Sequence, residues 1–428
     1  MSDGGSTQRQ RLAGQLRPPG DKSTTHRGLL LGALARGTTV LRRGLDCADT
    51  RSTAALVQAL GAQVAWSEAQ LTVVGHPEPL VPALVLDCGN SGTTARLATG
   101  LLAGRQGTWT LDGDDSLRGR PMGRVLQPLR SLGADVLGDK LPFTLRGAPL
   151  SGGEVSVEVP SAQVKSALLL AGLSGDGPLT VVQHVPTRDH TERMLPAFGA
   201  KLDVQPGAVT VRPSALEGAT VDVPADPSAA AFMIVGALLL PGSELVLQDV
   251  GLWPRRTGFL RALDRAGADI EVLSRSGGQS GADPRGDLAV RATRLRAFDI
   301  TPADVPDLVD EVPVLALAAA LAEGTSRFAG LAELRLKESD RVAAVAELLV
   351  ALGVTVELSA DALTIEGRGE LSGVARCDHH DHRLAMTATV ARLVSGHELP
   401  GEVPAAAISW PGFLDALRDG VCATGRCL

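Results

Sequence analysis

The sequence predicts an α/β (α+β) protein of two lobes, built from six repeats of about 70 residues. A short pattern in which an amphipathic helix ends at a glycine and an alternating strand follows recurs along the chain. Strongly apolar helices, each preceded by small or polar residues, interleave with this pattern at the same period. The 428 residues also exceed what one ordinary core accommodates.

The first series predicts the outer helices of the repeats. Its stretches read ALGAQV, SLGADV, AFGAKL, RAGADI and ALGVTV, and the glycines are Gly61, Gly133, Gly199, Gly267 and Gly353. These helices show a polar face and should lie outside. The longest interval contains residues 274–287, SRSGGQSGADPRGD, whose composition predicts a projecting loop.

The second series predicts the central helices. They are expected to begin near Ser23, Ser91, Ser161, Ser228, Asp310 and Asp381. A helix that is apolar around most of its circumference must be buried, so each lobe should contain three parallel buried helices. Their amino ends would point toward one end of each lobe, where helix dipoles and nearby cations favour anions.

The domain boundaries follow from the last repeat. Its outer helix, at 411–420, is expected to reach the C-terminus with no strand after it, and the segment Leu12 to Leu16 could supply the missing strand. The chain would then begin and end in one lobe, made of residues 1–20 and 228–428. Residues 21–227 would form the other lobe, with the active site in the cleft between the lobes.

Composition excludes several classes of partner. The net charge of −7 argues against nucleic acid, which requires a broad basic surface. No apolar run reaches the ~18 residues of a membrane span, and the polar first 17 residues do not look like a signal peptide, so we expect a cytoplasmic protein. Five cysteines without C-x-x-C spacing indicate reduced thiols. The CDHHDHR stretch, 377–383, is a weak metal candidate because its adjacent histidines would point apart.

The segment RPPGDKSTTHRGLLLGAL, residues 17–34, first suggests a nucleotide-binding P-loop. That motif fails because Leu16 stands in place of its first glycine and Asp21 separates Gly20 from Lys22. What remains is a helix start flanked by Lys22 and Arg27. It is either an anion site or an ordinary solvated helix cap.

Several motifs occur in the order found in one family. The stretches PPGDKSTTHR, DCGNSGTTAR, RGRPM, PSAQVKSALLLAGL, TRDHTERML, LVDEVPVLALAAALAEG, LRLKESDR and DHHDHRLAM span almost the whole chain and resemble the 5-enolpyruvylshikimate-3-phosphate (EPSP) synthase family. The resemblance implies six βαβαββ repeats, three per lobe, in a monomer that closes on its substrates. It also implies transfer of the enolpyruvyl group of phosphoenolpyruvate to the 5-hydroxyl of shikimate 3-phosphate, without metal or organic cofactor.

The resemblance assigns roles to residues of this chain. The catalytic set would be Lys22, Asp310, Glu338 and His382, with Asp310 near the reacting hydroxyl and Glu338 near the methylene carbon. Phosphoenolpyruvate would contact Lys22, Asn90, Gly92, Thr93, Arg120, Gln163, Arg341 and Arg383. Shikimate 3-phosphate would contact Lys22, Ser23, Arg27, Ser161, Ala162, Gln163, Arg188, Asp310 and Lys337.

The sequence departs from the family pattern at three places. Ala162 stands where many members have a second serine, Thr187-Arg188 replaces a serine-centred phosphate contact, and Ile408 stands where many members have lysine. The chain keeps Gly92, where glyphosate-tolerant members often have alanine, so we expect sensitivity to glyphosate.

Two alternative functions stay open at this point. A UDP-N-acetylglucosamine enolpyruvyl transferase shares the fold and the donor, but it typically has Lys-Asn in place of Lys22-Ser23 and a reactive cysteine in a loop, which residues 113–123 lack. A non-catalytic anion-binding repeat protein would explain the cations at helix starts. Such a protein has no need for Asp310 and Glu338 together.

Overall fold

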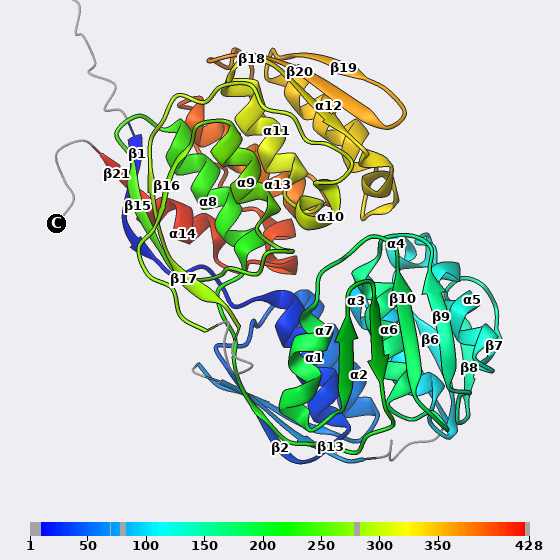
Figure 1. Cartoon of the computed structure of the whole chain (residues 1–428). Coiled ribbons are helices and arrows are strands. Elements are labelled where there is room, and N and C mark those ends of the chain that lie inside the picture. Colours follow the sequence, from blue (N-terminus) through cyan, green and yellow to red (C-terminus); the bar gives the residue numbers. More distant parts are fainter. Residues whose placement is uncertain (1–9, 69, 78–82, 278–282, 424–428) are drawn as a thin grey trace, which may run out of the picture. The chain divides into compact units, whose positions relative to one another are not determined.

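The computed structural model describes residues 10–68, 70–77, 83–277 and 283–423. Its internal contacts divide the chain into two compact units. Unit 1 comprises Met1–Pro19 and Ala225–Leu428, and unit 2 comprises Gly20–Pro224. Each unit has its own apolar core, and in each a central group of helices is surrounded by strands and further helices (Figure 1).

Three buried helices form the centre of unit 2: α1 (Lys22–Ala33), α3 (Gly92–Ala103) and α6 (Ala162–Gly172). Helix α3 contacts both α1 and α6. The α3–α6 contact depends on Gly100, because a Cβ atom there would lie 2.0 Å from the carbonyl oxygen of Ala167. Glycine thus lets two backbones approach where any side chain would force them apart.

In the described part of unit 2, three sheets and the outer helices surround this centre. The outer helices are α2 (Ala48–Ala59), α4 (Asp115–Arg118), α5 (Gly123–Ser131), α7 (His190–Met194) and the 3₁₀ helix η1 (Leu195–Phe198). The first sheet has the order β13-β2-β4-β3, with β14 also paired to β2; the others have the orders β5-β6-β8-β7 and β11-β12-β10-β9. Their bounds are β2 Ala35–Arg42, β3 Gln63–Trp66, β4 Gln70–Gly75, β5 Ala83–Asp87, β6 Gly107–Asp112, β7 Asp135–Leu137, β8 Phe143–Gly147, β9 Gly153–Val157, β10 Leu179–Gln183, β11 Leu202–Gln205, β12 Ala208–Val211, β13 Leu216–Glu217 and β14 Thr220–Asp222.

Unit 1 is also built around three buried helices: α8 (Pro227–Leu239), α11 (Val312–Leu321) and α13 (His382–Val394). All three contact one another. The remaining helices are α9 (Gly258–Arg265), α10 (Val305–Leu308), α12 (Arg341–Ala351), α14 (Phe413–Gly420) and the 3₁₀ helices η2 (Leu331–Leu336) and η3 (Pro404–Ile408).

The described part of unit 1 has two sheets. Their orders are β16-β17-β15-β1-β21 and β18-β20-β19. The bounds are β1 Gln10–Leu16, β15 Glu244–Gly251, β16 Asp269–Val272, β17 Arg285–Arg291, β18 Glu323–Ala329, β19 Thr355–Leu358, β20 Ala362–Arg368 and β21 Val421–Ala423. The other sheets each contain a pair of parallel strands. Next to β18, only two isolated parallel bridges take the place of such a strand: Arg296 with Glu323 and Ile300 with Phe328.

The N-terminal strand occupies the predicted place, but one expectation about the C-terminus is wrong. Strand β1 pairs with β15 in parallel register, so the N-terminal segment does complete a sheet. A further strand, β21, follows α14 and pairs antiparallel with β1, whereas the sequence predicted no strand after this helix. Val421–Ala423 was too short to show the alternating pattern that predicts strands.

The glycines that end the outer helices are confirmed. Gly61, Gly133, Gly199, Gly267 and Gly353 all have φ between 81° and 105°, a backbone conformation that favours glycine. The third outer helix is irregular, because α7 gives way after five residues to the 3₁₀ helix η1. Pro196 lies near the start of η1 and offers no backbone N–H for a continuing α-helix.

Three predicted helix starts need correction. Asp21, not Ser23, caps α1, because its Oδ1 accepts the Thr24 backbone N–H at 2.7 Å. Asp226, not Ser228, caps α8 in the same way, at 2.8 Å from the Ser228 backbone nitrogen. Helix α11 begins after Glu311 rather than at Asp310. An aspartate carboxylate caps the unpaired backbone N–H groups of a helix start as readily as a serine hydroxyl does, so at α1 and α8 the serine was wrongly predicted as the cap.

The predicted loop at 274–287 is partly wrong. Arg285 and the two residues after it belong to β17, which pairs with β15 and β16. Residues 278–282 of the predicted loop lie outside the described residues. A Cβ atom on Gly286 would lie 2.1 Å from the carbonyl oxygen of Ser274, so glycine at this position of β17 permits a close backbone approach.

The described cysteines with described side chains, Cys47, Cys88 and Cys377, are free thiols. Burial raises the pKa of the Cys88 thiol to about 12, so it stays protonated at neutral pH. The Cys422 side chain and Cys427 lie outside the described residues. Among the helices of the described ranges, none combines the length and the hydropathy needed to cross a membrane.

Candidate active site

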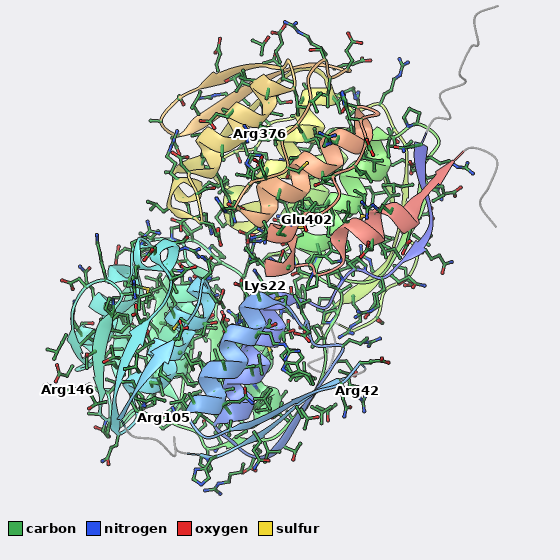
Figure 2. All side chains as sticks on the ribbon, turned by 180° about the vertical axis from the view of Figure 1, so that it is seen from behind. Lys22, Arg42, Arg105, Arg146, Arg376 and Glu402 are labelled. Carbon is green, nitrogen blue, oxygen red and sulfur yellow. The ribbon has the colours of Figure 1, made fainter. Side chains whose placement is uncertain are left out.

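Lys22 lies in the first turn of α1, in unit 2 (Figure 2). Its ammonium nitrogen lies 2.7 Å from Asp49 Oδ2 in α2, and both side chains are mostly buried. Ser23 follows and is half-buried. The pair with Asp49 fixes the position of the Lys22 charge at a helix N-terminus, a location that already favours anions.

Arg27 lies one turn further along α1 and is only 4% exposed. Its guanidinium donates from Nε to Thr191 Oγ1 at 2.7 Å and from Nη2 to Ser166 Oγ at 2.8 Å. Nη1 donates to the backbone carbonyl of Ser23 at 3.0 Å. The guanidinium is therefore held by neutral groups from three segments of the chain.

His26 connects α1 to its neighbours through a chain of buried hydroxyls. His26 Nδ1 lies 2.7 Å from Thr53 Oγ1, which lies 2.6 Å from Thr94 Oγ1, and Thr94 donates to Ser91 Oγ at 2.8 Å. Burial, with the charges of Lys22 and Arg27, lowers the pKa of His26 well below its usual value. A neutral histidine therefore links the starts of α1 and α3.

Gln163 joins the start of α6 to the start of α3. Its Oε1 accepts from Arg96 Nη1 at 2.8 Å, and its Nε2 donates to Thr93 Oγ1 at 3.0 Å. Arg96 also reaches the carbonyl of Gly92 at 3.4 Å. A Cβ atom on Gly92 would lie 2.6 Å from Arg96 Nη1 and 3.3 Å from Arg120 Nη1. The absence of a side chain at Gly92 leaves room for both guanidinium groups.

Asn90 and Arg120 form a second contact beside α3. Arg120 Nη2 donates to Asn90 Oδ1 at 2.7 Å and to Ser116 Oγ at 3.3 Å. Asn90 in turn donates from Nδ2 to Asp114 Oδ2 at 2.6 Å. Asp114 also caps the short helix α4, so the loop before Arg120 is anchored on the residue that holds Asn90.

Ser161 caps α6 by accepting the Val164 backbone N–H at 3.4 Å. Ala162 is the first residue of α6, and Arg188, half-buried, lies between β10 and α7. Lys165 holds that segment, because its ammonium lies 3.4 Å from the Thr187 carbonyl and 2.5 Å from Glu192 Oε1. The residues flanking Arg188 are thus fixed to α6.

In unit 1, Asp310 lies at the centre of a group of cations just before α11. Its Oδ1 lies 3.3 Å from Arg341 Nη1, 3.8 Å from Arg383 Nε and 4.0 Å from Lys337 Nζ. Arg383 also donates to the Asp310 backbone carbonyl at 3.2 Å. Residues far apart in sequence therefore meet at one carboxylate.

Arg341 is the most buried member of this group, with 1% of its side chain exposed. Its Nη2 lies 2.5 Å from Glu338 Oε2, and its Nε lies 2.8 Å from Asp381 Oδ2. Burial opposes the charge, yet Glu338, Asp381 and Asp310 together raise the pKa of Arg341. Three carboxylates thus keep a buried guanidinium ionised.

Asp381 caps α13 and bonds Arg341 at the same time. Its Oδ1 accepts the Arg383 backbone N–H at 2.9 Å, and its Oδ2 also accepts from Ser339 Oγ at 3.1 Å. Burial acts to raise the pKa of Asp381, but the Arg341 guanidinium outweighs it and the net shift is downward. Asp381 is therefore ionised at neutral pH.

Lys337 and His382 complete the predicted set in unit 1. Burial, reinforced by Arg341 and opposed by Asp310, lowers the pKa of Lys337. Because 27% of its side chain is exposed, solvent limits that shift. His382 is the first residue of α13 and is 1% exposed.

The structure brings most of the predicted residues together within each unit. Those of unit 1 meet around Asp310 and Arg341, and those of unit 2 lie at or beside the starts of α1, α3 and α6. Sequence reasoning missed the partners that hold them: Asp49, Asp114, Ser166 and Thr191, and the ion-pair role of Asp381. The cap position of Asp381 was visible in the sequence. Ser166 and Thr191 lie within the PSAQVKSALLLAGL and TRDHTERML motifs, but no sequence pattern shows that they contact Arg27.

A groove of about 480 Å³ runs along α5 and β9 and reaches Val164 in the first turn of α6. It is lined by Arg124, Gln127, Pro128, Ser131, the 154–159 segment and Val164. None of the predicted site residues lines it. The site is therefore defined by the convergence of charged and hydrogen-bonding side chains rather than by this hollow.

Comparison with known proteins agrees with the geometry. A family model described as EPSP synthase (3-phosphoshikimate 1-carboxyvinyltransferase) matches residues 6–417. The 3-phosphoshikimate 1-carboxyvinyltransferase of Synechococcus sp. (strain RCC307) is 47% identical over 433 residues, covering 97% of this chain and 98% of the relative. That of Thermus thermophilus is 50% identical over 417 residues, covering 95% of this chain and 96% of the relative.

A solved structure extends the comparison to the fold. EPSP synthase from Acinetobacter baumannii matches with a TM-score of 0.81 at 34% identity, covering 96% of each chain. This match confirms the predicted α/β fold. By sequence and by structure, the chain belongs to the EPSP synthase family.

Proposed function

We propose that this protein transfers the enolpyruvyl group of phosphoenolpyruvate to the 5-hydroxyl of shikimate 3-phosphate and releases phosphate. The proposal rests on family membership together with the polar groups of each unit. In the proposed reaction, the hydroxyl oxygen bonds to C2 of phosphoenolpyruvate while a proton adds to its methylene carbon. Loss of a proton from that carbon and of phosphate from C2 then yields the product.

Asp310 and Glu338 divide the proton transfers in this proposal. Asp310 takes the proton of the 5-hydroxyl, and Glu338 gives a proton to the methylene carbon and later removes one. General acids and bases contribute roughly 10²–10⁴-fold each to such steps. Lys22, held by Asp49, stabilises the negative charge near the reacting atoms.

The single observation that carries this assignment is the shared contact of both carboxylates with Arg341. Asp310 and Glu338 lie at different nitrogens of one guanidinium, at 3.3 and 2.5 Å. A protein that only bound anions would have no need for two carboxylates here, because each competes with a bound anion for the guanidinium. The observation therefore favours an enzyme over an anion-binding scaffold.

The cations divide between the two substrates by their chemistry. Planar guanidinium groups bind phosphate and carboxylate in bidentate fashion, so we assign Arg120, Arg341 and Arg383 to phosphoenolpyruvate with Asn90, Gly92, Thr93 and Gln163 beside them. Shikimate 3-phosphate takes Ser23, Arg27, Ser161, Ala162, Gln163, Arg188 and Lys337. His382 is retained in the catalytic set as the residue preceding Arg383.

A phosphate-release assay tests the proposed reaction. The protein is supplied with phosphoenolpyruvate and either shikimate 3-phosphate or UDP-N-acetylglucosamine as acceptor. We expect phosphate release that depends on shikimate 3-phosphate and does not occur with the sugar nucleotide. Release with UDP-N-acetylglucosamine alone would identify the rival transferase, and release with neither acceptor would contradict the proposed function.

The reaction also requires both groups of residues to act on the same substrates. We therefore retain the prediction that the protein closes when it binds shikimate 3-phosphate. Small-angle scattering should show a smaller radius of gyration at saturating ligand. An unchanged scattering profile, with binding confirmed by calorimetry, would contradict closure without affecting the assignment of the reaction.

A further inference from the structure

We propose that Ser166 and Thr191, two buried hydroxyl residues of unit 2, are positioning residues that set the orientation of Arg27 for the acceptor substrate. Neither residue belongs to the predicted binding set. This inference rests on the proposed role of Arg27 in binding shikimate 3-phosphate. It adds residues that act through Arg27 without contacting the substrate.

The contacts form a closed ring of hydrogen bonds. Arg27 Nε donates to Thr191 Oγ1 at 2.7 Å, and Arg27 Nη2 donates to Ser166 Oγ at 2.8 Å. The ring closes because the Thr191 hydroxyl donates to Ser166 Oγ at 2.7 Å. Nε and Nη2 are the two nitrogens on one edge of the guanidinium, so the ring fixes its plane as well as its position.

Burial of the ring restricts the orientation of the Arg27 side chain. Ser166 and Thr191 are 0% exposed, and Arg27 is 4% exposed. Water therefore has little access to replace either hydroxyl. A guanidinium N–H left unpaired in such a place loses its hydrogen bond to solvent as well, so the side chain would turn or shift to recover a partner.

The ring also joins three segments that carry predicted acceptor ligands. Arg27 belongs to α1, which starts with Lys22 and Ser23. Ser166 belongs to α6, which follows Ser161, and Thr191 belongs to α7, which begins two residues after Arg188. Orientation of Arg27 is thereby coupled to the backbone positions of two other ligand-bearing segments.

An ordinary buried hydroxyl in this unit behaves differently. Thr99 in α3 is also 0% exposed, but it donates to the carbonyl of Ala95 one turn earlier in its own helix. Such a bond only satisfies the hydroxyl. Thr99 is therefore a matched control for loss of a buried threonine hydroxyl in the same unit.

The test is the affinity of the full-length protein for shikimate 3-phosphate, measured by calorimetry without phosphoenolpyruvate. Thr191→Val keeps the side-chain shape and removes the hydroxyl, and we expect the dissociation constant to rise about tenfold. Thr191→Ser keeps the hydroxyl and should stay within about twofold of wild type. Thr99→Val should leave the dissociation constant unchanged.

A double-mutant cycle separates positioning from a general structural effect. If Thr191 acts through Arg27, Thr191→Val should weaken binding much less in an Arg27→Lys background than in the wild type. Equal effects in both backgrounds, or unchanged affinity in Thr191→Val alone, would overturn the inference. Should Thr191→Val fail to fold, Ser166→Ala enters the same cycle, and the same two outcomes would support or overturn the inference.

Failure of this inference and failure of the proposed function give different results. If the wild-type protein binds shikimate 3-phosphate and turns over, and Thr191→Val binds it equally well, only the positioning role is disproved. If the wild-type protein neither binds shikimate 3-phosphate nor turns over, the proposed function is disproved, and this inference loses its basis.

Discussion

Two buried arginines, one in each unit, have different kinds of partner. In unit 1, Arg341 contacts the carboxylates of Asp310, Glu338 and Asp381. In unit 2, Arg27 is held by two hydroxyls and a backbone carbonyl. Arg341 therefore contacts three carboxylates, whereas these three hydrogen bonds of Arg27 go to neutral groups.

The difference has a physical consequence for ligand binding and catalysis. Carboxylate partners hold a guanidinium by charge, and the guanidinium in turn favours the ionised form of each carboxylate. Hydroxyl partners fix a guanidinium in place while adding no opposing charge of their own. The unit 1 network thus favours carboxylates that accept protons, as Asp310 does in the proposed reaction, and the Arg27 network is suited to recognition of an anion.

Replacing Glu338 by Gln tests the catalytic side of this comparison and should have the largest effect. We expect turnover to fall about 10²–10⁴-fold because the amide cannot exchange a proton with the methylene carbon. Binding of shikimate 3-phosphate should remain within a few-fold. The measurement is phosphate release under saturating substrates, together with calorimetry of the acceptor.

The exposed Glu357, in β19 of the same unit, provides the control. Glu357→Gln should leave turnover unchanged. If Glu338→Gln retained wild-type turnover, the carboxylate would have no catalytic role, and unit 1 would resemble an anion-binding scaffold.

Replacing Asp381 by Asn tests the structural side of the ion-pair network. The change leaves Arg341 buried with one charge partner fewer, so we expect the free energy of unfolding to fall by about 3–5 kcal/mol. Chemical denaturation at neutral pH measures this loss. A change below about 1 kcal/mol would mean that the network does not depend on Asp381.

The same variant has a predicted pH signature. The pKa of Asp381 is lowered in the folded protein, so its stabilising contribution is present above the usual value of 3.8 and is lost as the pH falls through the folded pKa. The stability difference between wild type and Asp381→Asn should therefore shrink below about pH 4. A constant difference between pH 7 and the most acidic pH at which both fold would contradict the assigned shift.

Unit 2 contains a buried ion pair of its own, between Lys165 and Glu192, with 3% and 7% of the side chains exposed. Glu192→Gln leaves the Lys165 ammonium buried without that carboxylate, and we expect a loss of about 3 kcal/mol in the free energy of unfolding. The double variant Lys165→Met with Glu192→Leu removes both charges and should recover much of it. A double variant less stable than Glu192→Gln would contradict this account.

Replacing Gly92 by Ala should have the smallest effect, confined to ligand binding. The added methyl group would meet the ends of Arg96 and Arg120, so both side chains must shift. We expect the KM for phosphoenolpyruvate to rise about tenfold and inhibition by glyphosate to weaken, with no loss of stability because alanine is the better helix former.

Gly123 offers a matched control for this substitution. It is the first residue of α5, as Gly92 is of α3, and a Cβ atom there would meet only Gln127 Nε2, at 4.0 Å. Gly123→Ala should leave the KM unchanged. Equal KM values for wild type and Gly92→Ala would show that the two guanidinium groups move aside without cost to donor binding.

Much of the fold was determined by patterns that act over short distances. The apolar helices and the positive-φ glycines at 61, 133, 199, 267 and 353 could be read from the sequence, because periodicity and chain reversal depend on neighbouring residues. The motifs likewise placed Asp310, Glu338 and Arg341 in one functional set, and the structure brings these three into contact.

Other features were decided by tertiary structure alone. The strand β21 exists because β1 offers it an edge. The pairing of Lys22 with Asp49, and the ring of Ser166 and Thr191 around Arg27, join residues that the sequence keeps far apart. A charged or hydroxyl side chain has no sequence signal for its partner, because that partner is set by how separate helices pack.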